Sequence, residues 1–324
     1  MVHAVRIHSY GGPEVLVYES VDVPAPAPGE VRLRQRAAGL NYIDCYQRSG
    51  AYKLPALPAV LGMEGAGEVI ALGEGVTEVA LGDRVAYAMS VGGYAQERNI
   101  AAARVVKIPA SIDDATAAAM MLQGMTVRYL FCETFPVTAK TVMLFHAAAG
   151  GVGLIACQWA RALGATLIGT VGSDEKAALA LGNGASHVIN TKRENFVERV
   201  REITGGKGCD VAYDGVGKDT FPGSLDCLKP KGLWVSFGSA SGSVPPFEIA
   251  MLSGRGSLFA TRPTLATYIA KREDLVANTN DLFAMVEKGA IKIAVNQRYP
   301  LAQAAQAHRD LEARQTTGST VFEL

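Results

Sequence analysis

A glycine-rich turn between a strand and a helix constrains the fold of this chain more than any other feature. Residues 141–146 (TVMLFH) read as a buried strand, and residues 154–164 (LIACQWARALG) read as a helix. The run AAAGGVG at residues 147–153 joins them. Small residues there permit a tight turn, leave the backbone accessible and let the helix pack closely on the strand. A pyrophosphate that binds at a helix N-terminus requires all three properties. The turn therefore predicts a dinucleotide-binding unit.

Strand-like and helix-like segments alternate after this turn. The expected strands are ATLIGTV (165–171), HVIN (187–190), CDVAYDGV (209–216), GLWVSFG (232–238) and SLFATRP (257–263). The expected helices are DEKAALALG (174–182), ENFVERVREIT (194–204) and one around DTFPGSLDCL (219–228). This alternation predicts an α/β fold with a doubly wound parallel sheet, and the continuous apolar strands indicate that both faces of the sheet are covered.

The first 110 residues have a different pattern. Their β-branched or alternating runs are VRIHSY (5–10), LVYESVDV (16–23), EVRLRQRAAGLN (30–41), GAGEVIALG (65–73) and DRVAYAMS (83–90). Glycine and proline punctuate these runs, and no helix of useful length is expected among them. The pattern predicts an antiparallel barrel or sandwich. Ser111 is the expected N-cap of a helix that follows over residues 112–131.

The last sixty residues lead to a domain assignment. We expect one long helix over residues 265–289, a short strand within 291–300, a further helical stretch and a terminal strand. The terminal strands resemble the first domain more than the dinucleotide-binding unit. The sequence therefore predicts one domain from residues 1–124 and 265–324, and a dinucleotide-binding domain over residues 125–264.

Composition excludes several classes of protein. The 324 residues hold 31 Lys+Arg and 31 Asp+Glu, so the basic excess of a nucleic-acid binder is missing. The five cysteines are an odd number without close spacing, which argues against a disulfide framework or a thiolate metal site. The N-terminal residues lack the apolar core of a secretion signal, and the uncharged stretch 141–160 is divided by glycines. We expect a soluble cytoplasmic protein.

The end of the second strand bears on the choice of dinucleotide. An acidic residue that binds a ribose 2′-hydroxyl is expected there, but the strand ends at Gly172 and Ser173. The Ser173 hydroxyl and the Lys176 ammonium could instead hold a 2′-phosphate, which favours NADPH. The alternative is that Asp174 binds the ribose hydroxyl and Lys176 is a solvated helix charge.

A second glycine pattern lies in the β-rich region. It reads G-x-E-x-x-G-x5-G-x2-V from Gly62 to Val76, and GDRV follows at 82–85. Together with the dinucleotide turn, the pattern resembles the medium-chain dehydrogenase/reductase superfamily. Zinc-dependent members carry histidine and cysteine ligands where this chain has Met63 and Asn41. An amide and a thioether suit divalent zinc poorly, so we expect no metal.

Within that superfamily the chain is similar to the NADPH:quinone oxidoreductase (zeta-crystallin-like) branch over essentially its whole length. The motifs that carry the resemblance are YGGPE (10–14), NYIDCYQRSG (41–50), FHAAAGGVG (145–153), YDGVG (213–217), VSFG (235–238) and TRP (261–263). The resemblance implies a GroES-like β-barrel catalytic domain, a Rossmann domain that binds NADPH, and a homodimer or higher oligomer.

The resemblance also implies site residues. Asn41, Tyr46 and Tyr52 are the candidate catalytic residues. The candidate cofactor contacts are Asn41, Tyr42, Asp44, Tyr46, Tyr129, Gly150, Gly151, Val152, Gly172, Ser173, Lys176, Thr191, Val216, Phe237, Gly238, Ser239, Arg262 and Arg314. Thr191 stands where the family often has a tyrosine, and Lys192 or Arg193 could compensate.

These observations support an enzyme that transfers a hydride from NADPH to a planar quinone, held in a cleft between the domains, without a metal. One alternative is an NADPH-dependent enoyl-thioester or enone reductase, in which a tyrosine such as Tyr46 would supply a proton. The other is a non-catalytic protein that binds NADPH or RNA; zero net charge makes nucleic acid a weak partner. His146 is expected to be structural, and His308 is expected to be a surface or packing residue without a cysteine or acidic partner.

Overall fold

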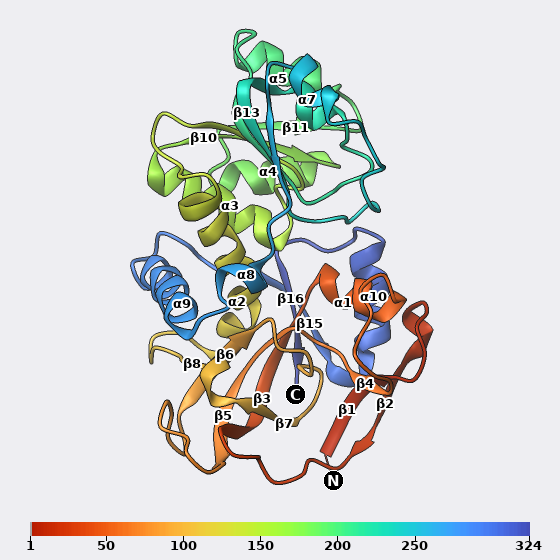
Figure 1. Cartoon of the computed structure of the whole chain (residues 1–324), viewed down its shortest axis with the longest axis vertical. Coiled ribbons are helices and arrows are strands. Elements are labelled where there is room, and N and C mark those ends of the chain that lie inside the picture. The colour runs from red at the N-terminus through yellow and green to blue at the C-terminus, as the bar shows by residue number, and fades with distance from the viewer. Residues whose placement is uncertain (1) are drawn as a thin grey trace. The chain divides into compact units, whose positions relative to one another are not determined.

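The computed structural model describes residues 2–324 and divides them into two compact units (Figure 1). Unit 1 comprises the residues up to Met125 together with Tyr268–Lys288 and Ile293–Leu324. Unit 2 comprises Thr126–Thr267 and Gly289–Lys292. Residues 265–267 and 289–292 therefore belong to unit 2 and Met125 to unit 1, whereas the sequence placed residues 265–324 with the first domain and residue 125 with the second.

Unit 2 is built on a six-stranded sheet in the order β11-β10-β9-β12-β13-β14, and all of its pairs are parallel. This is the doubly wound order that dinucleotide-binding sheets adopt. Its strands are β9 (Val142–Phe145), β10 (Thr166–Val171), β11 (His187–Asn190), β12 (Cys209–Asp214), β13 (Leu228–Ser236) and β14 (Phe259–Thr261). The predicted parallel α/β sheet is confirmed.

The helices of unit 2 separate these strands, as a parallel sheet requires. They are α3 (Gly151–Leu163), α4 (Asp174–Gly182), α5 (Phe196–Ile203), α6 (Gly223–Asp226) and α7 (Ala250–Gly254). Consecutive strands contribute Leu144, Ile168, Ile189, Ala212 and Trp234 to one buried apolar cluster. Burial of both sheet faces explains why the strands read as continuous apolar runs.

Unit 1 contains two mainly antiparallel sheets. The smaller has the order β2-β1-β4, and the larger has the order β15-β16-β3-β5-β6-β8, with β7 paired to β3. The strands are β1 (Val2–Ile7), β2 (Leu16–Val21), β3 (Glu30–Leu40), β4 (Ala59–Val60), β5 (Glu64–Leu72), β6 (Arg84–Ala88), β7 (Glu97–Ala101), β8 (Val106–Lys107), β15 (Val295–Pro300) and β16 (Ser319–Glu323). β16 runs antiparallel to β3, so the end of the chain does return to the first domain.

Three local expectations were wrong. A helix, α1 (Tyr42–Ser49), interrupts the β-rich region, where no useful helix was expected. Helix α2 (Asp114–Tyr129) begins after Asp113, whose carboxylate accepts the Thr116 N–H at 2.9 Å, whereas Ser111 binds Glu287 and caps nothing. The expected long C-terminal helix is divided into α8 (Leu265–Tyr268) and α9 (Arg272–Glu287), and α10 (Ala304–Glu312) follows.

The close packing around Gly153 in the glycine turn leads to a prediction about stability. A Cβ atom on Gly153 would lie 2.4 Å from the Ala147 carbonyl oxygen and 2.6 Å from the Ala148 backbone. A Cβ on Gly150 would meet only the Ala147 oxygen, at 3.4 Å. We predict that Gly153→Ala destabilises unit 2 by about 1–3 kcal/mol, as overpacking does, whereas Gly150→Ala costs well under ~1 kcal/mol. Thermal unfolding of both variants tests this, and equal midpoints would contradict it.

Candidate active site

The predicted cofactor residues of unit 2 gather at one edge of its sheet. Parallel strands all end on the same side, and each of these residues follows the carboxyl end of a strand. Gly150–Val152 follow β9, Gly172 and Ser173 follow β10, Thr191 follows β11, Val216 follows β12, Phe237–Ser239 follow β13, and Arg262 follows β14. We call this set the nucleotide edge. Tyr129 does not share the pattern, because it ends α2 and is only 2% exposed.

The first turn of α3 has the properties of an anion site. Its N-cap is Gly150, which has extended backbone and no side chain to bond the first N–H groups of the helix. Those N–H groups have no partner within a helix and carry its partial positive charge. The Ala148 N–H is held by the Thr170 carbonyl at 2.9 Å, which ties the turn to the neighbouring strand. The residues at this turn therefore fit the pyrophosphate of a dinucleotide.

The start of α4 offers the side chains for a 2′-phosphate. Ser173 is the N-cap, and its hydroxyl accepts the Lys176 backbone N–H at 3.3 Å. Asp174 is engaged elsewhere, since its carboxylate pairs with Arg193 at 2.6 Å and accepts the Asn190 amide at 2.7 Å. Thr191 donates its hydroxyl to the Val171 carbonyl, which joins the ends of β10 and β11. These contacts disfavour the alternative in which Asp174 binds a ribose hydroxyl.

Asp214 organises the other half of the nucleotide edge, although the sequence did not single it out as a site residue. It is fully buried at the end of β12 and accepts the N–H groups of Val216 and Gly217 at 2.9 and 3.0 Å. Its own carbonyl accepts the Phe237 N–H at 2.8 Å. Burial alone would raise the pKa of Asp214, but His146 and its hydrogen-bond donors bring that pKa below its usual value. The ionised carboxylate of Asp214 thus fixes the loop after β12, and its main-chain carbonyl holds the start of the loop after β13.

Arg262 closes the same loops from β14. Its guanidinium donates to the carbonyls of Ser236 and Gly238 at 2.7 and 3.0 Å and to the Ser239 hydroxyl at 3.3 Å. A Cβ on Gly238 would lie 2.5 Å from the Gly215 carbonyl oxygen, so the two loops touch through bare backbone. The structure therefore brings the predicted residues Gly238, Ser239 and Arg262 together.

In unit 1 the side chain of Asn41 is held in one orientation. Its Nδ2 donates to Glu64 Oε1 at 2.5 Å, and its Oδ1 accepts from Gln123 at 3.2 Å. Gln123 in turn accepts the Ser319 hydroxyl at 2.7 Å, and Glu64 Oε2 accepts the Leu122 N–H at 2.7 Å. We call Asn41, Glu64, Gln123 and Ser319 the amide centre. All four are buried.

The amide centre does not fit zinc. The nitrogen of Asn41 faces Glu64, and both Glu64 oxygens already accept N–H groups. The Met63 sulfur accepts from Gln47 at 3.2 Å. Across residues 2–324, no three His, Cys, Asp or Glu side chains are grouped so as to hold a metal ion. The side chains at the two zinc-ligand positions therefore do not form a ligand set for a metal ion.

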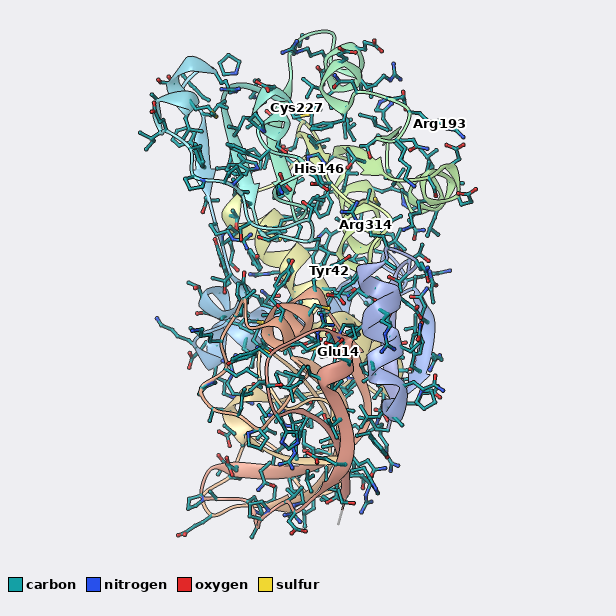
Figure 2. All side chains as sticks on the ribbon, turned by 90° about the vertical axis from the view of Figure 1, so that its right-hand side faces the viewer. Glu14, Tyr42, His146, Arg193, Cys227 and Arg314 are labelled. Carbon is teal, nitrogen blue, oxygen red and sulfur yellow. The ribbon has the colours of Figure 1, made fainter. Side chains whose placement is uncertain are left out.

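The predicted tyrosines of unit 1 lie together. The ring centroids of Tyr42 and Tyr46 are 6.3 Å apart, and those of Tyr46 and Tyr52 are 5.2 Å apart in an edge-on arrangement. Tyr42 donates its hydroxyl to the Leu311 carbonyl at 3.1 Å, at the end of α10. Arg314, which is labelled in Figure 2, follows that helix. Its backbone has a positive φ of 59°. The Tyr52 ring is 44% exposed, so this cluster offers an accessible aromatic surface.

Asp44 differs from the other predicted contacts in this unit. It is fully buried, and its Oδ2 accepts the Asn41 N–H at 2.8 Å and the Tyr94 hydroxyl at 2.9 Å. Burial raises the pKa of Asp44 to about 7 and that of Glu64 to about 8, despite the hydrogen bonds that each carboxylate accepts. The side chain of Asp44 thus acts on the start of α1 instead of facing a ligand.

Two histidines contrast with each other. His146 is buried, bonded to Thr170 at 2.9 Å and Ser224 at 3.0 Å, which confirms the expected structural role. His308 was expected to lack a cysteine or acidic arrangement, and this was wrong. It is buried on α10, with Cys45 at 3.5 Å and Tyr94 at 3.2 Å. Cys45 on α1 and Tyr94 before β7 both lie more than 200 residues from His308 in the sequence, so no local pattern could have revealed them.

Comparisons with known proteins agree with the division of the chain into two units. Residues 27–110 match the "Alcohol dehydrogenase GroES-like domain" family, and residues 151–275 match the "Zinc-binding dehydrogenase" family. A "Quinone oxidoreductase" of Pseudomonas aeruginosa is 52% identical over 323 residues, which cover 99% of both chains. A "2-haloacrylate reductase" of a Burkholderia species is 45% identical over 329 residues, again 99% of both.

A solved structure is similar to the whole chain. It is the Escherichia coli quinone oxidoreductase complexed with NADPH, at a TM-score of 0.98 and 48% identity, covering 99% of this chain and 100% of that one.

The raised pKa of Glu64 makes stability depend on pH. An unfolded glutamate loses its proton near pH 4.5, whereas folded Glu64 keeps it until about pH 8. The folded state therefore binds more protons in that window, and Glu64 favours folding less as pH rises, by at most ~1.4 kcal/mol per pH unit. Glu64→Gln cannot titrate. We predict that the wild type loses thermal stability relative to this variant between pH 5 and pH 8.

The control is Glu68→Gln on the same strand, where the side chain is 35% exposed and paired with Arg36. Its unfolding midpoint should keep a nearly constant offset from the wild type over the same pH range. A Glu64→Gln offset that is also constant would contradict the prediction.

Proposed function

Because this chain belongs to the quinone oxidoreductases of the medium-chain dehydrogenase/reductase family, we propose that it is an enzyme that transfers a hydride from NADPH to a quinone. The observation that carries the proposal is the nucleotide edge, where a bare helix N-terminus stands beside Ser173 and Lys176. The similar E. coli structure is described as a complex with NADPH, which supports the same cofactor here.

We assign the two units different tasks. Unit 2 is the NADPH-binding domain: the first turn of α3 receives the pyrophosphate, Ser173 and Lys176 receive the 2′-phosphate, and the loops that Asp214 and Arg262 hold receive the nicotinamide end. Unit 1 is the catalytic domain, with Asn41, Tyr46 and Tyr52 as its reactive surface. Tyr42 and Arg314 are further proposed contacts of the cofactor, whereas Asp44 acts through Asn41.

When bound, NADPH supplies the hydride, and a quinone that accepts it needs one proton to become a hydroquinone. The residues of this chain then have to orient and shield the reactants. Asn41 uses one Nδ2 hydrogen on Glu64 and keeps the other for a ligand oxygen. The tyrosine cluster offers a face on which a planar ring can stack. A reduced quinone takes its proton readily from water, so the residues need not include a strong general acid.

The enone reductase is the runner-up. Its supporting observation is the relative named 2-haloacrylate reductase, at 45% identity. Three relatives that are more similar to this chain, at 52%, 51% and 49% identity, carry the name quinone oxidoreductase, which favours the quinone as the acceptor. A non-catalytic or RNA-binding role has no support in these comparisons.

We also propose a homodimer in the cytoplasm. The edge strand β14 exposes Phe259 by 62%, and Ile249, the residue before α7, is 81% exposed, so apolar surface is available for a second copy. All five cysteines are free, as is usual in a reducing compartment. Among residues 2–324 no helix has the length and apolar character to cross a bilayer.

The acceptor is tested by following NADPH oxidation with benzoquinone, 2-chloroacrylate and a crotonyl thioester under the same conditions. We predict that kcat/KM is highest for benzoquinone, by at least roughly tenfold, which corresponds to ~1.4 kcal/mol of transition-state stabilisation. Prior incubation with a zinc chelator should leave the rate unchanged, because the amide centre does not fit zinc. Preference for the thioester would move the enone reductase to first place.

Cofactor selectivity is tested at Lys176. A charge-assisted contact to the 2′-phosphate is worth about 1.5–3 kcal/mol, so Lys176→Ala should weaken NADPH binding roughly ten- to a hundredfold and leave NADH binding nearly unchanged. Lys207→Ala is the control, because Lys207 precedes β12 and lies toward the opposite ends of the strands. Equal losses for both cofactors in Lys176→Ala would refute the assignment.

A further inference from the structure

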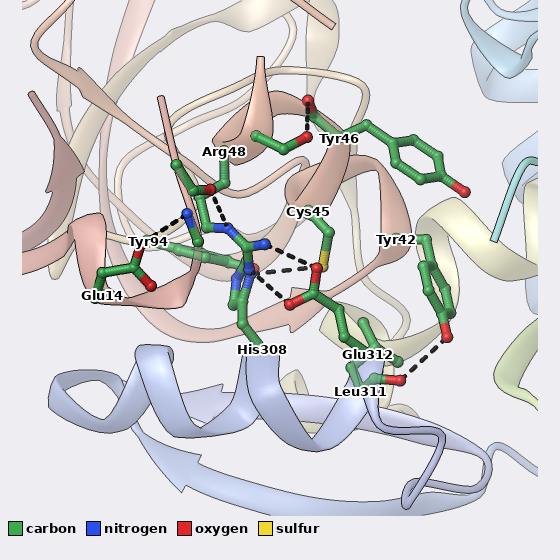
Figure 3. A network of polar contacts seen from close by, with 12 residues as sticks. Glu14, Tyr42, Cys45, Tyr46, Arg48, Tyr94, His308, Leu311 and Glu312 are labelled. Atoms are coloured by element: carbon green, nitrogen blue, oxygen red, sulfur yellow. Dashed lines mark hydrogen bonds and ion pairs between the residues drawn. The ribbon is translucent and has the colours of Figure 1, made fainter. Parts of the chain in front are cut away.

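A line of buried side chains links helix α10 to the start of α1 within unit 1, and Figure 3 shows three of its members, Arg48, His308 and Tyr94. Arg48 Nη1 lies 3.0 Å from His308 Nδ1, and His308 Nε2 lies 3.2 Å from the Tyr94 hydroxyl oxygen. Tyr94 donates its hydroxyl to Asp44 Oδ2 at 2.9 Å. Arg48 is 3% exposed, and the other three are fully buried. We call Arg48, His308, Tyr94 and Asp44 the relay.

The hydrogens of the relay can point in only one direction. A guanidinium donates and never accepts, so His308 Nδ1 must be an acceptor. The proton of the neutral ring is then on Nε2, which donates to Tyr94, and the Tyr94 hydrogen is left for Asp44. Burial and the charge of Arg48 lower the pKa of His308 to about 3, which keeps the ring neutral. The guanidinium of Arg48 and the neutral ring therefore fix the direction of the hydrogen bonds at the His308 end of the relay.

Both ends of the relay are anchored. At one end, Arg48 makes two contacts with Glu312, at 3.0 and 2.7 Å, and donates to the Gly11 carbonyl at 3.1 Å. At the other end, Asp44 Oδ2 also accepts the backbone N–H of Asn41 at 2.8 Å. The backbone N–H of Met63 also stabilises the Asp44 carboxylate. Tyr94 is thus one of three donors that hold Asp44, together with the backbone N–H groups of Asn41 and Met63.

We propose that Tyr94 and His308 are positioning residues for the hydride transfer, because they hold Asp44 where it fixes the backbone of Asn41 at the start of α1. This inference rests on the proposed function of Asn41. Neither residue bonds to the Asn41 side chain, which the amide centre holds. The relay instead sets where α1 begins, and α1 carries Tyr42 and Tyr46. A purely apolar contact between α10 and α1 would pack the helices without fixing the direction of any hydrogen bond.

Tyr94→Phe and Tyr87→Phe form a matched pair of variants. Both rings are fully buried in unit 1, and each variant deletes one buried hydroxyl; the Tyr87 hydroxyl donates to Gln35. We expect similar losses of thermal stability. With NADPH and benzoquinone, kcat should fall roughly tenfold in Tyr94→Phe, within the ~10²-fold that a 1 Å misplacement can cause, and under about twofold in Tyr87→Phe. Equal kcat losses in the two variants would overturn the proposal.

The conservative variant His308→Gln provides a rescue. Its amide oxygen can accept from Arg48 and its amide nitrogen can donate to Tyr94, so the direction of the relay is kept. His308→Leu removes both bonds. We expect His308→Gln to keep at least about half of the wild-type kcat and His308→Leu to lose roughly as much as Tyr94→Phe. Equal losses in the glutamine and leucine variants would show that His308 serves packing alone.

Hydrogen exchange separates this inference from the proposed function. The amide hydrogen of Asn41 should exchange roughly tenfold faster in Tyr94→Phe than in the wild type, and at the wild-type rate in Tyr87→Phe. A wild type that oxidises no NADPH with any quinone would refute the function, while exchange would still report on the relay. Unchanged exchange at Asn41 in Tyr94→Phe would refute the relay even in an active enzyme.

Discussion

The hydrogen bonds to the buried carboxyl group of Glu64 are the interaction on which unit 1 depends. This group stands at the start of β5 and accepts N–H groups from Asn41, just before α1, and from Leu122 in α2. Gly39 on β3 makes room for it, since a Cβ there would lie 2.2 Å from Glu64 Oε1. A buried carboxyl group without these partners would be strongly unfavourable, so barrel and helices are held to one arrangement. The Asn41 side chain is oriented as a consequence.

In unit 2 the corresponding buried acid is Asp214, which is ionised. The Asp214 carboxylate accepts two backbone N–H groups, the hydroxyls of Thr220 and Ser224 and the indole N–H of Trp234, so its charge is distributed over five donors. The carboxylate fixes the loop after β12, while the Asp214 carbonyl and Arg262 hold the loop after β13. The sheet supplies the common edge, and the buried acid determines the shape of the loops on it. Both units therefore place a buried acid directly behind residues that we propose as ligand contacts.

Some of this could be read from the residues in order. The parallel sheet, its dinucleotide turn and the positions of Ser173 and Lys176 follow from local patterns, because strand ends and glycine turns are short-range features. Helix α1 was missed because it spans only eight residues, mixes polar with aromatic side chains and directly follows a long strand. The N-cap Asp113 was missed because Ser111 is an equally good capping residue by type.

The sequence by itself determined the fold class, the family and the residue types that stand at the zinc-ligand positions, because these reside in contiguous motifs. Tertiary structure alone decided what those residues contact. Glu64, Gln123 and Ser319 meet around Asn41 from three distant segments, and His308 meets Arg48 and Tyr94 from two others. Asp44, expected to contact the cofactor, instead lies inside. The physical reason is that burial and hydrogen-bond partners are set by packing between distant segments, and no local spacing encodes which donor an interior carboxylate will find.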